Sequence, residues 1–134
     1  MLTLALLTTA LLFGGMVLYS FGFAAFLFTA LPPDVAGPAI RRAFPMFYLF
    51  VLGTAAAAAA LLLSADPLAA GLLALIVATA LPARQILMPA INRATDTGAK
   101  RRFKALHGLS VVITLAHITL AGFVLVRFAG GLVS

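Results

Sequence analysis

The stretch GTAAAAAALLL, from Gly53 to Leu63, contains no charged side chain and no alternation of polar and apolar residues. The strands of a membrane β-barrel alternate their side chains with a period of two, so this run is not typical of a barrel. In lipid, an unbroken apolar segment satisfies its own backbone hydrogen bonds only as a helix. We therefore predict that this stretch belongs to a membrane-spanning α-helix.

The rest of the chain is as apolar as this stretch. Of its 134 residues, 64% are hydrophobic and only 9% are charged, and the mean hydropathy is +1.20. Soluble domains carry charge on roughly a quarter of their residues, because their surface must be solvated by water. We therefore expect an integral membrane protein, with room for about four spans of roughly 20 residues each.

Prolines and charged residues divide the chain into four expected spans of a single domain, residues 1–134. The spans cover residues 2–31, 44–63, 68–91 and 106–128. The first residues lack the basic region of a secretory signal peptide, so we expect the first span to be retained. Asp66 is expected to cap the third span. The predicted fold class is all-α, an integral membrane four-helix up-down bundle.

Two finer predictions concern the helices themselves. The segment PPDVAGPAIRRAFP, residues 32–45, predicts a short interfacial helix capped by Asp34, ahead of the second span. Ala70, Ala74 and Ala78 recur every four residues, which predicts a smooth ridge for close helix packing.

Basic residues gather on one side of the predicted bundle. Two expected loops, residues 32–43 and 92–105, together carry Arg41, Arg42, Arg93, Lys100, Arg101, Arg102 and Lys104. The opposite side has only Arg127. By the positive-inside rule both loops are cytoplasmic and both termini are non-cytoplasmic, in a multi-pass protein of a bacterial inner membrane. The net charge of +6 is then a topology signal, and we expect no nucleic-acid partner.

The basic loops also predict contact with anionic lipids, worth about 1 kcal/mol per basic residue near the surface. The residues expected to make this contact are Arg41, Arg42, Lys100, Arg101, Arg102 and Lys104. The alternative is that these residues only set the orientation of the chain.

A polar cluster is expected where the third and fourth spans meet at their cytoplasmic ends. Its members are Arg84, Gln85, Asn92, His107 and Ser110. Gln85 and Asn92 are seven residues apart and share a helical face, and His107, Ser110 and Thr114 form one stripe. The cluster either holds a ligand or only joins the helices by hydrogen bonds. For Arg84, the alternative is that its side chain reaches the lipid headgroups.

The expected spans contain no carboxylate or thiol side chain, the groups on which much enzyme chemistry depends. Asp34, Asp66 and Asp96 all fall in expected loops, and the chain has no Cys, so we expect no metal site and favour a non-enzymatic protein. His107 and His117 lie about 15 Å apart along one helix, too far to bind the same metal ion. Each is a possible axial ligand of a haem, which is the one cofactor left open.

Several short motifs carry a family resemblance. A Phe-rich first span with glycines precedes FPMFY (44–48), MPAIN (88–92) and FKALHGLS (103–110). Over about residues 8–128, this order resembles the transmembrane protein 205-like domain family of small four-helix membrane proteins. The resemblance implies a four-span bundle with its motif residues near one membrane face. The matching positions are Phe44, Pro45, Tyr48, Pro89, Asn92, His107, Gly108 and Ser110.

The leading functional hypothesis is a binding or accessory subunit that holds a lipid, a small ligand or a partner protein through the polar cluster. A homo-oligomer or a larger membrane complex is compatible with this role. One alternative is a haem-binding redox protein that uses His107 or His117. The other is a small transporter or metal-resistance component, although the sequence has no clear paired metal-ligand motif.

Overall fold

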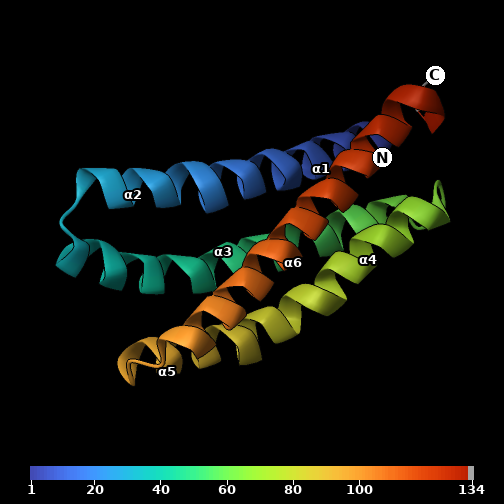
Figure 1. Cartoon of the computed structure of the whole chain (residues 1–134). Helices are drawn as coiled ribbons and strands as arrows, with labels where there is room; N and C mark the ends of the chain where they lie inside the picture. The colour runs from blue at the N-terminus through green and yellow to red at the C-terminus, as the bar shows by residue number, and fades with distance from the viewer. Residues whose placement is uncertain (133–134) are drawn as a thin grey trace.

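Four long helical segments make up the computed structural model, which describes residues 1–132. The segments are Leu2–Ala30, Pro33–Leu62, Pro67–Asp96 and Lys100–Gly131, and each is long and apolar enough to cross a membrane. They run alternately in opposite directions (Figure 1), and the described range contains no strand. The prediction of an all-α fold with four membrane-length helices is therefore confirmed.

Each long segment except the second contains a π-helical turn. In chain order the elements are α1 (Leu2–Val17), η1 (Leu18–Phe23), α2 (Ala24–Ala30), α3 (Pro33–Leu62), α4 (Pro67–Pro82), η2 (Ala83–Leu87), α5 (Met88–Asp96), α6 (Lys100–Arg127) and η3 (Phe128–Leu132). Helices α3 and α6 each contact both α1 and α4, which closes a ring of four. Helix α2 packs on α3 and α5 packs on α6, but α2 and the start of α6 diverge at that end (Figure 1).

Small side chains bring the helices close together, but not along the ridge that the alanine repeat predicts. Ala70 is buried, whereas Ala74 and Ala78 are exposed, so the prediction is wrong for these two residues. A strict four-residue repeat overshoots the helical period of 3.6 and turns away from one face. The buried face of this segment instead alternates steps of three and four: Ala69, Leu73, Ile76, Ala80, Ala83 and Leu87.

The second helix begins earlier than predicted. Helix α3 runs without a break from Pro33 through Pro38 and Pro45, so the expected interfacial helix is part of it. Asp34 is not a cap, because Pro32 occupies the cap position and no side-chain hydrogen bond is made there. The Asp34 carboxylate instead lies in the first helical turn, where the helix dipole favours a negative charge.

The predicted cap at the start of the third segment is confirmed. Asp66 precedes α4, and its Oδ1 accepts a hydrogen bond from the backbone N–H of Ala69 over 3.2 Å. This bond satisfies one of the backbone donors that every helix leaves unpaired in its first turn.

The π-helical turn η2 lies between Pro82 and Pro89 and sets the direction of the side chains that follow. Pro89 has no N–H to donate to the carbonyl of Gln85, so the regular pattern of helical hydrogen bonds is interrupted here. The N–H of Met88 reaches back to the carbonyl of Ala83, five residues earlier. A π turn accommodates an extra residue, which rotates the downstream helix relative to the upstream one.

Candidate functional site

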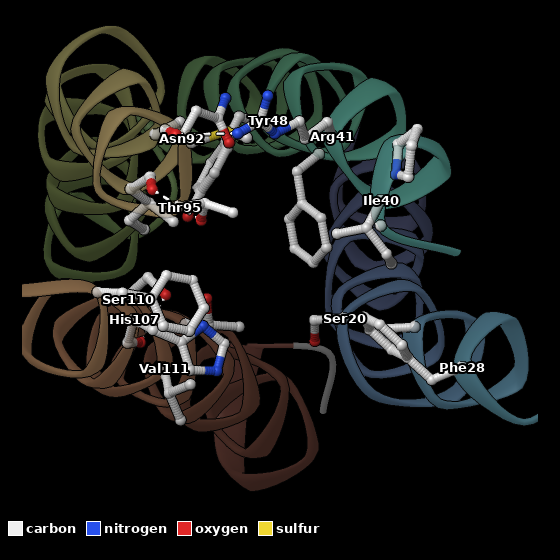
Figure 2. Close-up of a pocket in the computed structure, with 18 of the residues that line it drawn as sticks. Ser20, Phe28, Ile40, Arg41, Tyr48, Asn92, Thr95, His107, Ser110 and Val111 are labelled. Carbon is white, nitrogen blue, oxygen red and sulfur yellow. Dashed lines mark hydrogen bonds between the residues drawn. The ribbon is translucent and has the colours of Figure 1, made fainter. Parts of the chain in front are cut away.

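A pocket of about 660 Å³ lies inside the bundle at the end that contains the α2–α3 and α5–α6 connections. Side chains from η1, α2, α3, α5 and α6 line it, so every long segment contributes to the wall. Figure 2 shows the labelled side chains of these helices surrounding the cavity. The volume is within the range of small-molecule sites, about 300–1,000 Å³.

Helix α6 supplies a polar stripe to the pocket. His107, Ser110 and Thr114 all line it, as the helical spacing predicts for one face. The His107 ring stacks on the Phe103 ring, with 5.5 Å between the ring centroids and 6° between the planes. The Ser110 hydroxyl donates to the His107 carbonyl over 2.7 Å. This stacking holds the His107 ring at the edge of the cavity (Figure 2).

Helix α3 supplies the facing wall with Arg41, Phe44 and Tyr48. Tyr48 is only 2% exposed, and its hydroxyl lies beside that of Thr114. The ring of Phe47 packs edge-on against Tyr48, with centroids 5.3 Å apart. Phe47, which is not part of the lining, therefore supports Tyr48, and these rings belong to an aromatic cluster that holds this wall in place.

The aromatic cluster also ties η1 to α3. Tyr19 packs against Phe47 with ring centroids 5.2 Å apart, and its hydroxyl donates to the Ala43 carbonyl over 2.7 Å. Residues of η1 next to Tyr19, among them Ser20 and Phe21, consequently reach the pocket. This contribution of the first span is not predictable from the sequence, because a Phe-rich run in a membrane helix is equally typical of lipid contact.

An ion pair crosses the mouth of the pocket. Arg41 Nη2 donates to Asp96 Oδ1 over 2.6 Å and to the backbone carbonyl of Asn92 over 2.9 Å. The two charged side chains are 38% and 61% exposed, respectively. This contact joins the start of α3 to the end of α5, and both partners line the cavity.

Three of the five residues of the predicted polar cluster meet at this pocket, namely Asn92, His107 and Ser110. Arg84 and Gln85 lie outside its lining. Arg84 Nε donates to the Pro45 carbonyl over 3.2 Å, and Nη1 donates to Gln85 Oε1 over 3.3 Å. The seven-residue spacing of Gln85 and Asn92 does not place them together, because η2 changes the helical phase between them.

The motif positions of the family resemblance are distributed in the same way. Phe44 and Tyr48 line the pocket, and Pro45 accepts the hydrogen bond from Arg84. Pro89 and Gly108 are exposed and are not part of the lining.

His117 lies in a separate environment, between α4 and α6. It is 4% exposed, and its Nε2 is 2.7 Å from the Thr79 hydroxyl. His107, in contrast, is exposed at the pocket. Over residues 1–132 no three His, Cys, Asp or Glu side chains come together as a metal would require. A haem bound through either histidine stays a prediction.

The remaining basic residues surround the pocket end without lining the cavity. All of these side chains are exposed: Arg42, Arg93, Lys100, Arg101, Arg102 and Lys104. Arg41 differs from them, because it points to the pocket and is paired with Asp96. Contact of these residues with anionic lipids stays a prediction.

A second ion pair lies at the opposite end of the bundle. Arg127 Nε and Nη2 donate to Asp66 Oδ2 and Oδ1 over 2.8 and 3.0 Å. Asp66 is 4% exposed, and its hydrogen bonds with Arg127 lower the pKa of the carboxyl group. This pair was not among the predictions, although Asp66 and Arg127 are the only charged side chains that the sequence places at that end.

Comparison with known proteins gives one finding. A family model described as a domain of unknown function (DUF4149) matches residues 7–100. The matched range includes the first helical segment from residue 7, the whole second and third segments, and every wall of the pocket except α6. No curated protein and no solved structure matches significantly.

Proposed function

We propose that this chain, which belongs to the DUF4149 family of uncharacterised domains, is a multi-pass membrane protein that binds a lipid-like amphiphile in its pocket. The resemblance to the transmembrane protein 205-like family is part of this proposal, as is placement in a bacterial inner membrane. The observation that carries the proposal is the combination of polar and apolar groups in one cavity at the basic end of the bundle.

Membrane insertion is supported by the outer surface of the bundle. Large apolar side chains project outward along its length, and Leu4, Phe26, Val112 and Val126 are each more than half exposed. A soluble monomer rarely exposes a continuous apolar surface of this extent. Lipid is the solvent in which such a surface carries no penalty.

The lining of the pocket matches an amphiphilic molecule. Phe21, Phe28 and Phe44 present apolar rings to the cavity. The Asn92 amide and the His107 ring face the same cavity, and neither side chain has a hydrogen-bond partner within the part of the protein that the structure describes. Ligand sites typically combine apolar walls with a few such convergent polar groups.

The position of the pocket favours a ligand taken from the bilayer. The exposed basic residues at the same end belong at the level of the lipid headgroups by the positive-inside rule. Helices α2 and α6 both line the cavity and diverge at this end (Figure 1). An amphiphile bound between these two helices would keep its acyl tail beside the hydrocarbon core of the bilayer and its polar group beside Asn92 and His107.

Filling the pocket tests this function. Val111 lines the cavity, whereas its neighbour Val112 is 62% exposed and points outward. Delipidated protein in maltoside micelles is titrated with monopalmitoylglycerol and with palmitate, and the bound species are counted by native mass spectrometry. Val111→Trp is expected to lose at least about tenfold in affinity for any amphiphile that binds, a loss of about 1.4 kcal/mol.

Val112→Trp is the matched control and is expected to bind as the wild type does, because it adds the same bulk on the outer surface. Circular dichroism establishes that both variants keep their helix content. Absence of binding of either amphiphile to the wild type, or equal binding by both tryptophan variants, would contradict the proposed function.

A further inference from the structure

If the pocket binds an amphiphile, as in the proposed function on which this subsection rests, its polar residues determine the charge of that ligand. Arg41 is the cation at the pocket mouth, and its protein bonds all come from Nη2. A guanidinium group has five N–H donors spread over three nitrogens. Within residues 1–132, Nε and Nη1 of Arg41 have no protein acceptor, so an incoming acid group finds free donors on Arg41 before the Asp96 carboxylate leaves.

A carboxylate already occupies part of this site. Asp96 approaches Arg41 to 2.6 Å, which is the short distance of a charge-assisted hydrogen bond. Both side chains are substantially exposed, and exposed ion pairs contribute little to stability. Exchange of the Asp96 carboxylate for an external acid group therefore costs the protein little.

The surrounding charge favours an external anion over a cation. Six further basic side chains lie at this end of the bundle, against Asp34 and Asp96 as the only acids there. Charge of one sign around a cavity with low-dielectric walls raises the local concentration of the opposite charge. Asn92 and His107 add polar groups that face the same cavity.

We propose that the ligand is an anionic single-chain amphiphile whose acid group replaces the Asp96 carboxylate on Arg41. Its hydrocarbon chain then lies against Phe21, Phe28 and Phe44. The bidentate fork of arginine suits both carboxylate and phosphate groups. Asp96 acts in this arrangement as an internal competitor that holds Arg41 in place while the pocket is free of ligand.

Two substitutions at the ion pair test this proposal with palmitate as the anionic probe and monopalmitoylglycerol as the neutral probe. Asp96→Asn removes the competing carboxylate and leaves Arg41 free, so palmitate is expected to bind about threefold to tenfold more tightly. Arg41→Gln removes the cation, and palmitate is expected to bind about tenfold more weakly. Binding of the neutral probe is expected to change less than twofold in both variants.

Arg42→Gln is the matched control, since it removes the same charge from the next residue, which is exposed and outside the pocket lining. An equal loss of palmitate binding in Arg41→Gln and Arg42→Gln would overturn the proposal, because only the general field would then matter. Weaker palmitate binding by Asp96→Asn would also overturn it. Failure of both probes to bind the wild type would instead reject the proposed function itself.

Lysophosphatidic acid in the same titration distinguishes the two acid groups. Whichever of palmitate and lysophosphatidic acid binds more tightly identifies the preferred acid group. Weaker binding of that probe to Arg41→Gln supports the assignment of an anion site at Arg41.

Discussion

Asp66 shows how a single carboxylate connects two helices at the end of the bundle opposite the pocket. It caps the N-terminus of α4 through Ala69 and receives two hydrogen bonds from Arg127 on α6. With 4% of its surface exposed, the carboxylate depends on these partners for its charge. Because the pair closes the ring between α4 and α6, its protonation state is expected to affect the stability of the whole bundle.

Acidification is therefore expected to destabilise the protein through Asp66. Arg127 lowers the pKa of Asp66 in the folded state below its ordinary value of 3.8. A lowered folded-state pKa contributes stability that is complete above the unfolded-state pKa and is lost as the pH falls through the folded-state pKa. The melting temperature in detergent should thus show no loss from Asp66 between neutral pH and about pH 5, and decline below about pH 4.

Asp66→Asn isolates this effect, because asparagine still caps a helix but forms no ion pair. We expect it to melt lower than the wild type at neutral pH and to approach the wild type in acid. Asp34→Asn, at an exposed position, is the control and should preserve the acid transition. An unchanged acid transition in Asp66→Asn would show that the carboxylate does not carry the pH dependence.

At the scale of helices, the contact between α1 and α3 depends on a glycine. A Cβ atom added at Gly15 would overlap the ring of Phe50, whereas a Cβ at Gly14 would meet nothing within 4 Å. Gly15→Ala is expected to destabilise the protein by about 1–3 kcal/mol, because the half-buried Phe50 ring must turn away. Gly14→Ala is expected to be neutral or stabilising, since alanine is the better helix former by about 1 kcal/mol.

Phe50→Leu in the Gly15→Ala background provides the decisive comparison. A smaller side chain at position 50 removes the overlap, so the double variant is expected to recover part of the lost stability. The measurement is unfolding of the single and double variants in the same mixed micelles. If the two glycine substitutions prove equally destabilising, the close approach of α1 and α3 at Gly15 is wrong.

Helix formation and local helical spacing are the parts of the structure that can be predicted from the sequence. Hydropathy predicts the four helices because every segment surrounded by lipid must be helical. Helical spacing likewise places His107, Ser110 and Thr114 on one pocket wall, since α6 is regular over this stretch. Spacing fails for Gln85 and Asn92, because the π turn η2, between Pro82 and Pro89, changes the helical phase between them.

Contacts between segments far apart in the sequence are harder to predict. Arg41 binds residues 51 and 55 positions away, and Arg84, besides its neighbour Gln85, binds the Pro45 carbonyl 39 residues away. Both arginines fit a basic loop or a headgroup contact equally well when only the sequence is considered. Their roles follow from how α3 packs against the third segment, which no local pattern encodes.

Over the whole molecule, charge is distributed unequally between the two ends. The pocket end carries seven basic residues, of which Arg41 is paired with Asp96. The other end has Asp66 and Arg127, which neutralise each other. The seven basic residues against the single Arg127 are what predict a cytoplasmic pocket end by the positive-inside rule, and this orientation stays a prediction.

This orientation is testable with single cysteines, because the natural chain has none. Thr97→Cys lies at the exposed α5–α6 turn of the pocket end, and Ser64→Cys lies at the exposed α3–α4 turn of the other end. In intact bacterial cells, a membrane-impermeant maleimide is expected to label Ser64→Cys, and to label Thr97→Cys only after the inner membrane is permeabilised. The unsubstituted chain, free of thiols, gives the background. If only Thr97→Cys is labelled in intact cells, the orientation is the reverse of the one expected. The pocket and its proposed anion site would then lie at the outer leaflet.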